Sequence, residues 1–164
     1  MTAPPLAATP RRGDARAIAA LLDVVSVHVN TTSWWNNASF ALPLAGAVIS
    51  LLAGFVFGSA EALGFGGFLA FVTLAMLPVV LLTWRRTPTA VVLTREAVVA
   101  LHDGTELRRI AWTALARIER ADYDNIKWRL RPAEGDHLSI EVELTDLDAL
   151  IERASELSGL TPTS

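Results

Sequence analysis

A single charged side chain, Glu61, lies in the long stretch Val24–Trp84, and this feature most constrains what the chain can fold into. Its apolar part, Phe40–Trp84, suits the interior of a lipid bilayer. As one helix it would be about 67 Å long, roughly twice the thickness of the hydrocarbon core. It must therefore break, and a cluster of glycines near its middle marks the break. The sequence predicts a hairpin of two membrane-spanning helices, at about 38–58 and 65–84.

The rest of the chain is as polar as this stretch is apolar. Hydrophobic residues make up 52% of the sequence and charged residues 19%, and most of the charges follow residue 84. The absence of cysteine excludes disulfides and thiolate metal sites. A net charge of −3 gives no support to nucleic-acid binding, so no nucleic-acid partner is expected.

Basic residues flank both predicted spans on the same side. Arg85 and Arg86 directly follow the second span, and three arginines precede the first, whereas the connecting turn holds only Glu61. Because basic residues favour the cytoplasmic side, both termini are predicted to be cytoplasmic. We therefore expect a multi-pass protein of the cell inner membrane, with the bilayer as its first partner and Glu61 in a solvated turn.

Small residues recur at every fourth position of the first predicted span, at Gly46, Ser50, Gly54 and Gly58. Such a face lets another helix approach closely, which is a common packing device in lipid. It could seat the second helix of the same hairpin. Self-association or docking to a larger membrane complex would use the same face.

Short β-strands are predicted from residue 89 onward, because Val-rich and alternating runs are separated by turn residues. The predicted strands are 89–94, 97–102, 105–111, 116–121, 126–131 and 138–144. An amphipathic helix follows at Asp146–Ser158, with a capping box of Thr145 and Asp148 at its start and Gly159 after its end.

The last two strands should pair so that their apolar residues share one face. The expected pairs are Trp128–Val142, Leu130–Ile140, Arg129–Glu141 and Lys127–Glu143. This register would set the basic residues of 126–131 against acids. It indicates a cross-strand charge ladder and not a surface for nucleic acid or anionic lipid.

Two segments resemble a known family. Leu93–Val99 (LTREAVV) and Ile110–Glu119 (IAWTALARIE) are similar to the strand pair and the W-x-x-I segment of bacterial proteins in which a pleckstrin-homology-like (PH-like) domain is attached to a two-helix membrane hairpin. This chain has Leu115 where Ile is usual and Ala111 where Pro is frequent. The resemblance covers roughly residues 36–160. It implies an α+β domain at 88–160, an antiparallel barrel or sandwich of six or seven strands with a C-terminal amphipathic helix.

The seventh strand could come from the N-terminal cytoplasmic segment, residues 1–37. Val24–Asn30 alternates apolar and polar residues, so it could join the later sheet after a short helix near Asp14–Leu22. The alternative is an amphipathic interfacial helix through Ile18, Leu21 and their neighbours. With the strand, the hairpin of residues 38–84 would be an insertion within one domain.

No catalytic, cofactor-binding or metal-binding set is recognisable, so we expect a non-enzymatic protein without cofactors. The leading hypothesis is an inner-membrane protein whose cytoplasmic PH-like domain binds a protein or peptide. The alternative is a small accessory subunit of a membrane complex, assembling through the small-residue face. Arg85, Arg86, Arg108 and Arg109 are candidates for contact with lipid headgroups, although acids interleaved among the basic residues also fit a solvated mixed surface.

Overall fold

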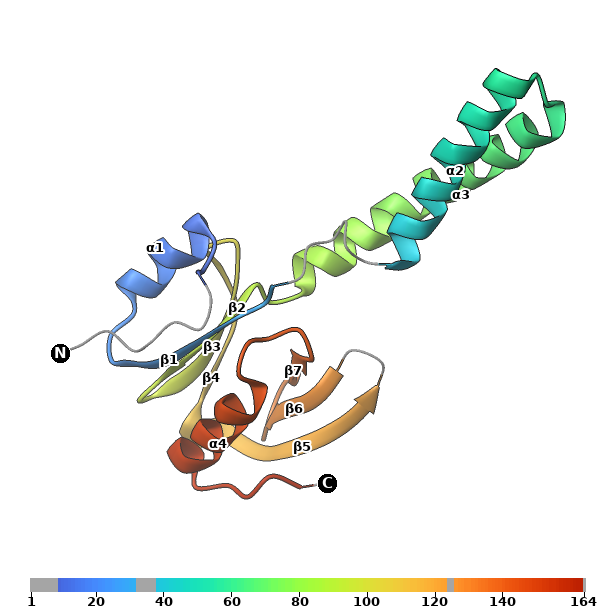
Figure 1. Ribbon diagram of the computed structural model, residues 1–164. Helices are drawn as coiled ribbons and strands as arrows, with labels where there is room; N and C mark the ends of the chain where they lie inside the picture. The colour runs from blue at the N-terminus through green and yellow to red at the C-terminus, as the bar shows by residue number, and fades with distance from the viewer. Residues whose placement is uncertain (1–8, 32–37, 124–125, 164) are drawn as a thin grey trace. The chain divides into compact units, whose positions relative to one another are not determined.

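The chain folds into two units in the computed structural model, which describes residues 9–31, 38–123 and 126–163. One unit combines Met1–Thr31 with Thr87–Ser164, and the other is Thr32–Arg86. The first unit is thus discontinuous in sequence, because the second is inserted within it. It is a small α+β structure with two antiparallel sheets (Figure 1).

The larger sheet has four strands in the order β1-β2-β3-β4, and the smaller has three in the order β5-β6-β7. The six strands predicted after residue 88 are all present. The strands are β1 (Val24–Val29), β2 (Ala90–Thr94), β3 (Ala97–His102), β4 (Thr105–Ala111), β5 (Leu115–Tyr123), β6 (Ile126–Pro132) and β7 (Leu138–Glu141). A short 3₁₀ turn, Trp112–Ala114, leads from the first sheet to the second.

The segment before the inserted unit forms a helix and then a strand. Helix α1 (Arg12–Ala20) ends before a turn at Asp23, whose φ is 54°. β1 then pairs antiparallel with β2, so that Val27 faces Val92 and Val29 faces Ala90. The residues on either side of the inserted unit are therefore neighbours in one sheet. The unit extends beyond the predicted range 88–160 at its N-terminal side.

In the first sheet, β4 is largely exposed, but β2 and β3 are buried on both faces of the sheet. Its inner face packs on the second sheet and on helix α4 (Leu147–Ser158), with Leu93, Ile118 and Leu150 fully buried. Its outer face is covered by α1, on the opposite side from α4 (Figure 1). Val-rich strands with few polar residues suit this position, since both sides of each strand lose contact with water.

The predicted register of β6 and β7 is wrong by two residues. Leu130 pairs with Leu138 and Trp128 with Ile140, whereas Leu130–Ile140 and Trp128–Val142 were expected. A shift of two keeps every side chain on its predicted face, because strand residues alternate with a period of two.

The expected charge ladder is therefore wrong in its partners. Arg129 lies opposite Ser139 and not opposite Glu141. Because β7 ends at Glu141, Glu143 lies outside the strand and is not the strand partner of Lys127. One basic residue of β6 pairs instead with an acid of β5, because the carboxylate of Glu119 forms an ion pair with Arg131 at 2.9 Å.

β7 ends early because the chain beyond it joins β1. Leu144 bridges Asn30, and the Thr145 N–H donates to the Val29 carbonyl at 3.1 Å. This contact links the first strand to the second sheet. It also leaves the Val142 side chain exposed, whereas the sequence placed it in the interior.

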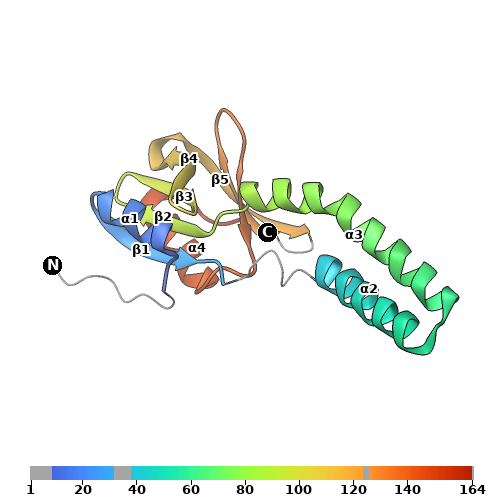
Figure 2. The same ribbon diagram turned by 90° about the horizontal axis from the view of Figure 1, so that it is seen from above.

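The inserted unit is a hairpin of two helices, α2 (Ala38–Phe57) and α3 (Ala60–Arg86), which run side by side (Figure 2). The predicted break between 58 and 65 is wrong, because only two residues separate the helices. Gly58 takes a left-handed conformation, with φ of 64°, and the Ser59 hydroxyl accepts the Ala62 N–H at 3.2 Å. Glu61 therefore lies in the first turn of α3 and not in a loop.

Among the described helices, α3 alone is long and apolar enough to cross a membrane. α2 contributes a shorter apolar stretch, Ala41–Phe57.

Candidate functional site

The outer edge of β5 is paired with the segment that follows α4, residues Leu160–Thr163, called here the 160–163 segment. The Thr163 N–H donates to the Ile118 carbonyl at 2.8 Å, and the Arg120 N–H donates to the Thr163 carbonyl at 2.8 Å. Thr163 thereby forms a parallel bridge with Glu119. Its hydroxyl also donates to the Ile118 carbonyl at 3.2 Å. The segment thus pairs with β5 in the way that an extended peptide adds to the edge of a sheet.

The end of α4 directs this segment onto β5. Gly159, in the place the sequence gives it, adopts a left-handed conformation with φ of 70° and ends the helix. The Ser155 hydroxyl donates to the Leu160 carbonyl at 2.6 Å. The Leu160 side chain packs against the inner core. Leu160 and Thr163 are therefore the two anchored residues, Leu160 by packing and the exposed Thr163 by its hydrogen bonds, and Thr161 between them is exposed.

The start of α4 differs from the sequence prediction. Asp146 precedes the helix in a left-handed conformation, with φ of 50°, and makes no capping hydrogen bond through its side chain. The Thr145 hydroxyl accepts the Val29 N–H at 3.0 Å. The capping box with Asp148 is therefore wrong, because Thr145 is used to hold β1.

A polar cluster closes β1 against the residues after β7. The His28 Nδ1 lies 2.8 Å from the Thr145 carbonyl, and the Asn30 amide donates to the Glu141 carboxylate at 3.1 Å. Burial lowers the pKa of His28, which favours the neutral ring. Burial raises the pKa of Glu141, and the nearby Glu143 carboxylate raises it further. Since His28 and Glu141 bond to groups within the fold, the cluster is suited to holding the sheets together.

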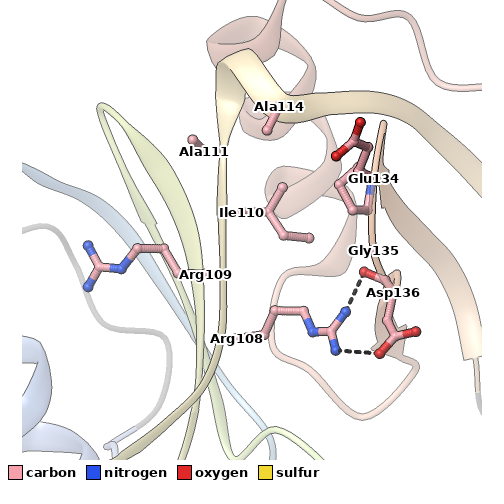
Figure 3. A pocket seen from close by; sticks show the side chains of 9 residues that line it. Arg108, Arg109, Ile110, Ala111, Ala114, Glu134, Gly135 and Asp136 are labelled. Atoms are coloured by element: carbon pink, nitrogen blue, oxygen red, sulfur yellow. Dashed lines mark hydrogen bonds and ion pairs between the residues drawn. The ribbon is translucent and has the colours of Figure 1, made fainter.

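A hollow of about 250 Å³ lies between β4 and the turn that joins β6 to β7 (Figure 3). The Arg108 guanidinium extends across it and forms an ion pair with Asp136 at 3.1 Å. Arg109, the next residue, extends to the other side of β4 and forms an ion pair with Glu106 at 2.8 Å. The hydrogen bond from Arg109 lowers the pKa of Glu106. Arg108 and Arg109, two of the four arginines proposed for lipid headgroups, are therefore paired with acids of the same unit.

The other two arginines in that prediction, Arg85 and Arg86, form the last turn of α3 and are exposed. Cations at the C-terminal end of a helix interact favourably with its dipole. Within the described residues, no ion pair joins either of them to an acid.

The small-residue face of α2 is occupied by α3. A Cβ added at Gly54 would lie 2.6 Å from the Leu63 side chain, and one at Gly46 would lie 3.1 Å from Leu69. Ser50, between these two glycines, is partly buried. Gly58 has open space around it and serves the turn. The first use expected for this face, the contact within the hairpin, is present in the structure.

Gly66 of α3 is a close-packing residue that was not predicted from the sequence. A Cβ added to it would lie 2.8 Å from the Leu51 side chain of α2. Its spacing from the neighbouring glycines marks no helix face, so the sequence carries little signal for this role.

One buried acid was also missed. Asp14 of α1 is fully buried, and its carboxylate accepts the Thr89 hydroxyl at 2.7 Å and the Gly104 N–H at 2.8 Å. These bonds hold α1 on the outer face of the first sheet. Asp14 lies four and seven residues before Ile18 and Leu21, on the apolar side of the helix, and this spacing was the available signal.

The described residues contain no group of side chains suited to binding a metal ion. Among residues 9–31, 38–123 and 126–163, no group of three or more His, Asp or Glu side chains could hold a metal ion. The His102 Nδ1 lies 2.7 Å from the Thr87 carbonyl, which fixes this ring within the fold.

Comparisons with known proteins add no assignment. No protein-family model, curated protein or solved structure matches the chain. What the chain does must therefore be inferred from the geometry of its own residues. Two features stand out, the apolar surface of the helical hairpin and the β5 edge that accepts an extended segment.

Proposed function

We propose that the chain is a membrane-anchored binding module. In this proposal the α2–α3 hairpin lies in the cell inner membrane, and the β-rich unit, with both termini, lies in the cytoplasm. That unit binds a protein partner through an extended peptide and catalyses no reaction. The observation that carries the proposal is the contrast in exposure between the two units.

The hairpin exposes large apolar side chains along both helices. Of the nineteen exposed large apolar residues in the described part of the chain, sixteen lie between Leu42 and Leu82. Phe57 is 81% exposed and Phe55 77%. Soluble proteins rarely expose a continuous apolar surface of this kind, whereas lipid would cover it.

The length of α3 and the flanking charges agree with this placement. α3 has 27 residues, and a span needs about 20, whereas the apolar stretch of α2, Ala41–Phe57, is shorter. Arg85 and Arg86 end α3 at the side opposite the Gly58 turn, where headgroups would attract them.

The β-rich unit supports a binding role. A four-stranded and a three-stranded antiparallel sheet with a C-terminal helix is the arrangement that the PH-like resemblance implies. Sheet edges can bind extended peptides through main-chain hydrogen bonds. The β5 edge holds such a segment from the same chain, so its geometry suits an extended ligand.

The membrane part of the proposal can be tested by labelling. Because the chain has no cysteine, single cysteines at Glu61 and Ser164 give specific sites for a thiol reagent that cannot cross membranes. In intact spheroplasts we expect labelling at position 61 only, and at position 164 only after lysis. The cysteine-free chain is the control. Labelling at position 164 but not 61 would reverse the orientation, and extraction of the chain by alkaline carbonate would reject membrane insertion.

The binding part can be tested with the full chain in detergent and a displayed library of random peptides. Enrichment of extended sequences that bind with micromolar affinity is the expected result. The failure of any peptide to bind, both to this chain and to the variants described below, would reject the binding role.

A further inference from the structure

We propose that β5 is the peptide-binding edge, and that the 160–163 segment occupies it until a partner displaces it. The partner is an extended peptide with an apolar side chain at the position of Leu160 and a β-branched hydroxyl residue three positions later, as at Thr163. This inference rests on the proposed function and adds the site, the chemistry of the peptide and the way in which the site is kept closed.

The contact has the geometry of strand addition. Thr163 gives its N–H to Ile118 and accepts the N–H of Arg120, which is how one residue of a parallel strand bonds to its neighbour. These bonds involve only the main chain on both sides. Any extended chain can therefore make them, and a partner needs no copy of the segment's whole sequence.

The side chains supply the selectivity. Leu160 packs with Leu157 against the inner core, and the Thr163 hydroxyl adds a bond to the Ile118 carbonyl. Thr161 is exposed, as is Thr163, but no side-chain hydrogen bond joins Thr161 to the described part of β5, and Pro162 has no N–H to donate. An apolar residue and a hydroxyl residue at this spacing are therefore the two positions that the edge can distinguish.

The segment is a short occupant of a long strand. β5 has nine residues, and within the described part of the chain the main-chain pairing of the segment involves Ile118, Glu119 and Arg120. A peptide that pairs over more of β5 would gain contacts that the segment does not make. The covalent attachment of the 160–163 segment to α4 favours the segment over a free peptide, because a short tether holds it at an effective concentration in the millimolar range.

The test uses the full chain in detergent and a labelled peptide with the sequence of residues 158–164, Ser-Gly-Leu-Thr-Pro-Thr-Ser. Thr163→Pro removes the N–H that bonds to Ile118, and the double variant with Leu160→Ser also removes the apolar anchor. Thr161→Ala, at the exposed position, is the matched control. Peptide affinity is measured by fluorescence anisotropy, and hydrogen exchange of the Arg120 amide reports directly whether the edge is occupied.

We expect the double variant to exchange the Arg120 amide at least tenfold faster than the unaltered chain and to bind the peptide at least tenfold more tightly. Saturating peptide should restore the slow exchange. Thr163→Pro should show the same changes to a smaller degree, and Thr161→Ala should match the unaltered chain. Circular dichroism with a thermal melt verifies that each variant is folded.

Two results would overturn the inference. Unchanged Arg120 exchange in both folded variants would show that the segment does not close the edge. Faster exchange that the peptide fails to reverse would show that the edge does not accept this peptide chemistry. If library peptides still bind without affecting the Arg120 amide, the proposed binding function stands and its site lies elsewhere.

Discussion

The two units of this protein are both rich in apolar residues but treat them in opposite ways. In the β-rich unit, β2 and the first five residues of β3 are buried throughout. In the hairpin, large side chains such as Phe55 and Phe57 are more than three-quarters exposed. The two units differ in how many neighbouring elements cover their apolar residues. A strand inside a sheet that is covered on both faces loses all contact with solvent, whereas a helix with a single partner can bury only one stripe of its surface.

The difference in exposure indicates what surroundings the hairpin requires. An apolar helix that buries one stripe must find an apolar environment for the rest of its surface. The β-rich unit supplies that environment from its own chain, through two sheets and two helices. The hairpin exposes most of its apolar surface to the surroundings, and this is the reason for the proposal that it lies in lipid.

Truncation of a buried leucine in the β-rich unit should have the largest effect. An equal effect from truncating an exposed leucine in the hairpin would contradict the comparison between the two units. Leu130→Ala removes a fully buried side chain from the inner core and should lower the free energy of unfolding by about 2–5 kcal/mol. Leu52→Ala, at a side chain that is 60% exposed, is the matched control and should cost less than about 1 kcal/mol. Denaturant unfolding of the full chain in detergent measures both.

The next effect concerns the way α1 covers the first sheet. Asp14→Ala leaves the Gly104 N–H without this acceptor and the Thr89 hydroxyl with the Leu101 carbonyl at 3.2 Å, so a loss of about 1–3 kcal/mol is expected. Arg16→Ala, on the exposed side of the same helix, should change the free energy of unfolding by less than about 0.5 kcal/mol. Equal losses in the two variants would contradict the role given to the carboxylate.

Two glycines separate the effect of packing within the hairpin from that of its exposed surface. Gly54→Ala should weaken the helix contact by about 1–3 kcal/mol, because the new methyl group would meet Leu63. Gly67→Ala, where the added group meets open space, should be neutral or stabilise by up to about 1 kcal/mol. Helix separation in a dodecyl sulfate titration can be read by energy transfer between dyes on the two helices. A weaker contact in Gly67→Ala than in Gly54→Ala would refute this assignment.

The smallest expected effect is a pH dependence of the β-rich unit. The pKa of Glu141 is raised by burial and by Glu143, so the folded state favours the protonated acid, and the resulting stability declines as the pH rises above 4.5. Glu141→Gln should remove this decline and raise the free energy of unfolding at pH 7 by less than about 1 kcal/mol, since the group is partly exposed. Unfolding curves between pH 4.5 and 7 measure the effect, with Glu134→Gln in an exposed turn as the control.

His28 should act in the opposite direction and in a different pH range. Burial lowers its pKa, so the unfolded state binds the proton more readily, and stability is lost as the pH falls below 6.5. A curve for Glu141→Gln that still loses stability on the acid side agrees with this assignment. Replacing His28 should then remove that loss.

Local pattern was enough to predict most of the elements. The alternation of residues along β6 and the Asp103-Gly104 turn, whose φ values are 51° and 88°, depend on nearest neighbours in the chain. The strands after residue 88 and the end of α4 at Gly159 were therefore within reach of the sequence. The register of β6 and β7 was not, because registers two residues apart bury the same faces.

The candidate site was less accessible to prediction than the fold. Nothing local in Leu160–Thr163 indicates a partner 45 residues earlier in the chain, at Ile118. The arginines at 108 and 109 could be recognised as basic, but their neutralisation by Asp136 and Glu106 depends on how the strands and turns come together.

The sequence by itself determined the division of this protein into a nearly uncharged hairpin and a charged, strand-rich unit, because hydropathy and periodicity are properties of short stretches. Only the tertiary structure decided that β1, on the far side of the hairpin, belongs to the same sheet as β2. It also decided which buried groups hold α1 in place and what occupies the β5 edge. These depend on contacts between residues distant in the chain, where register, burial and hydrogen bonding are fixed together by the packing of the whole unit.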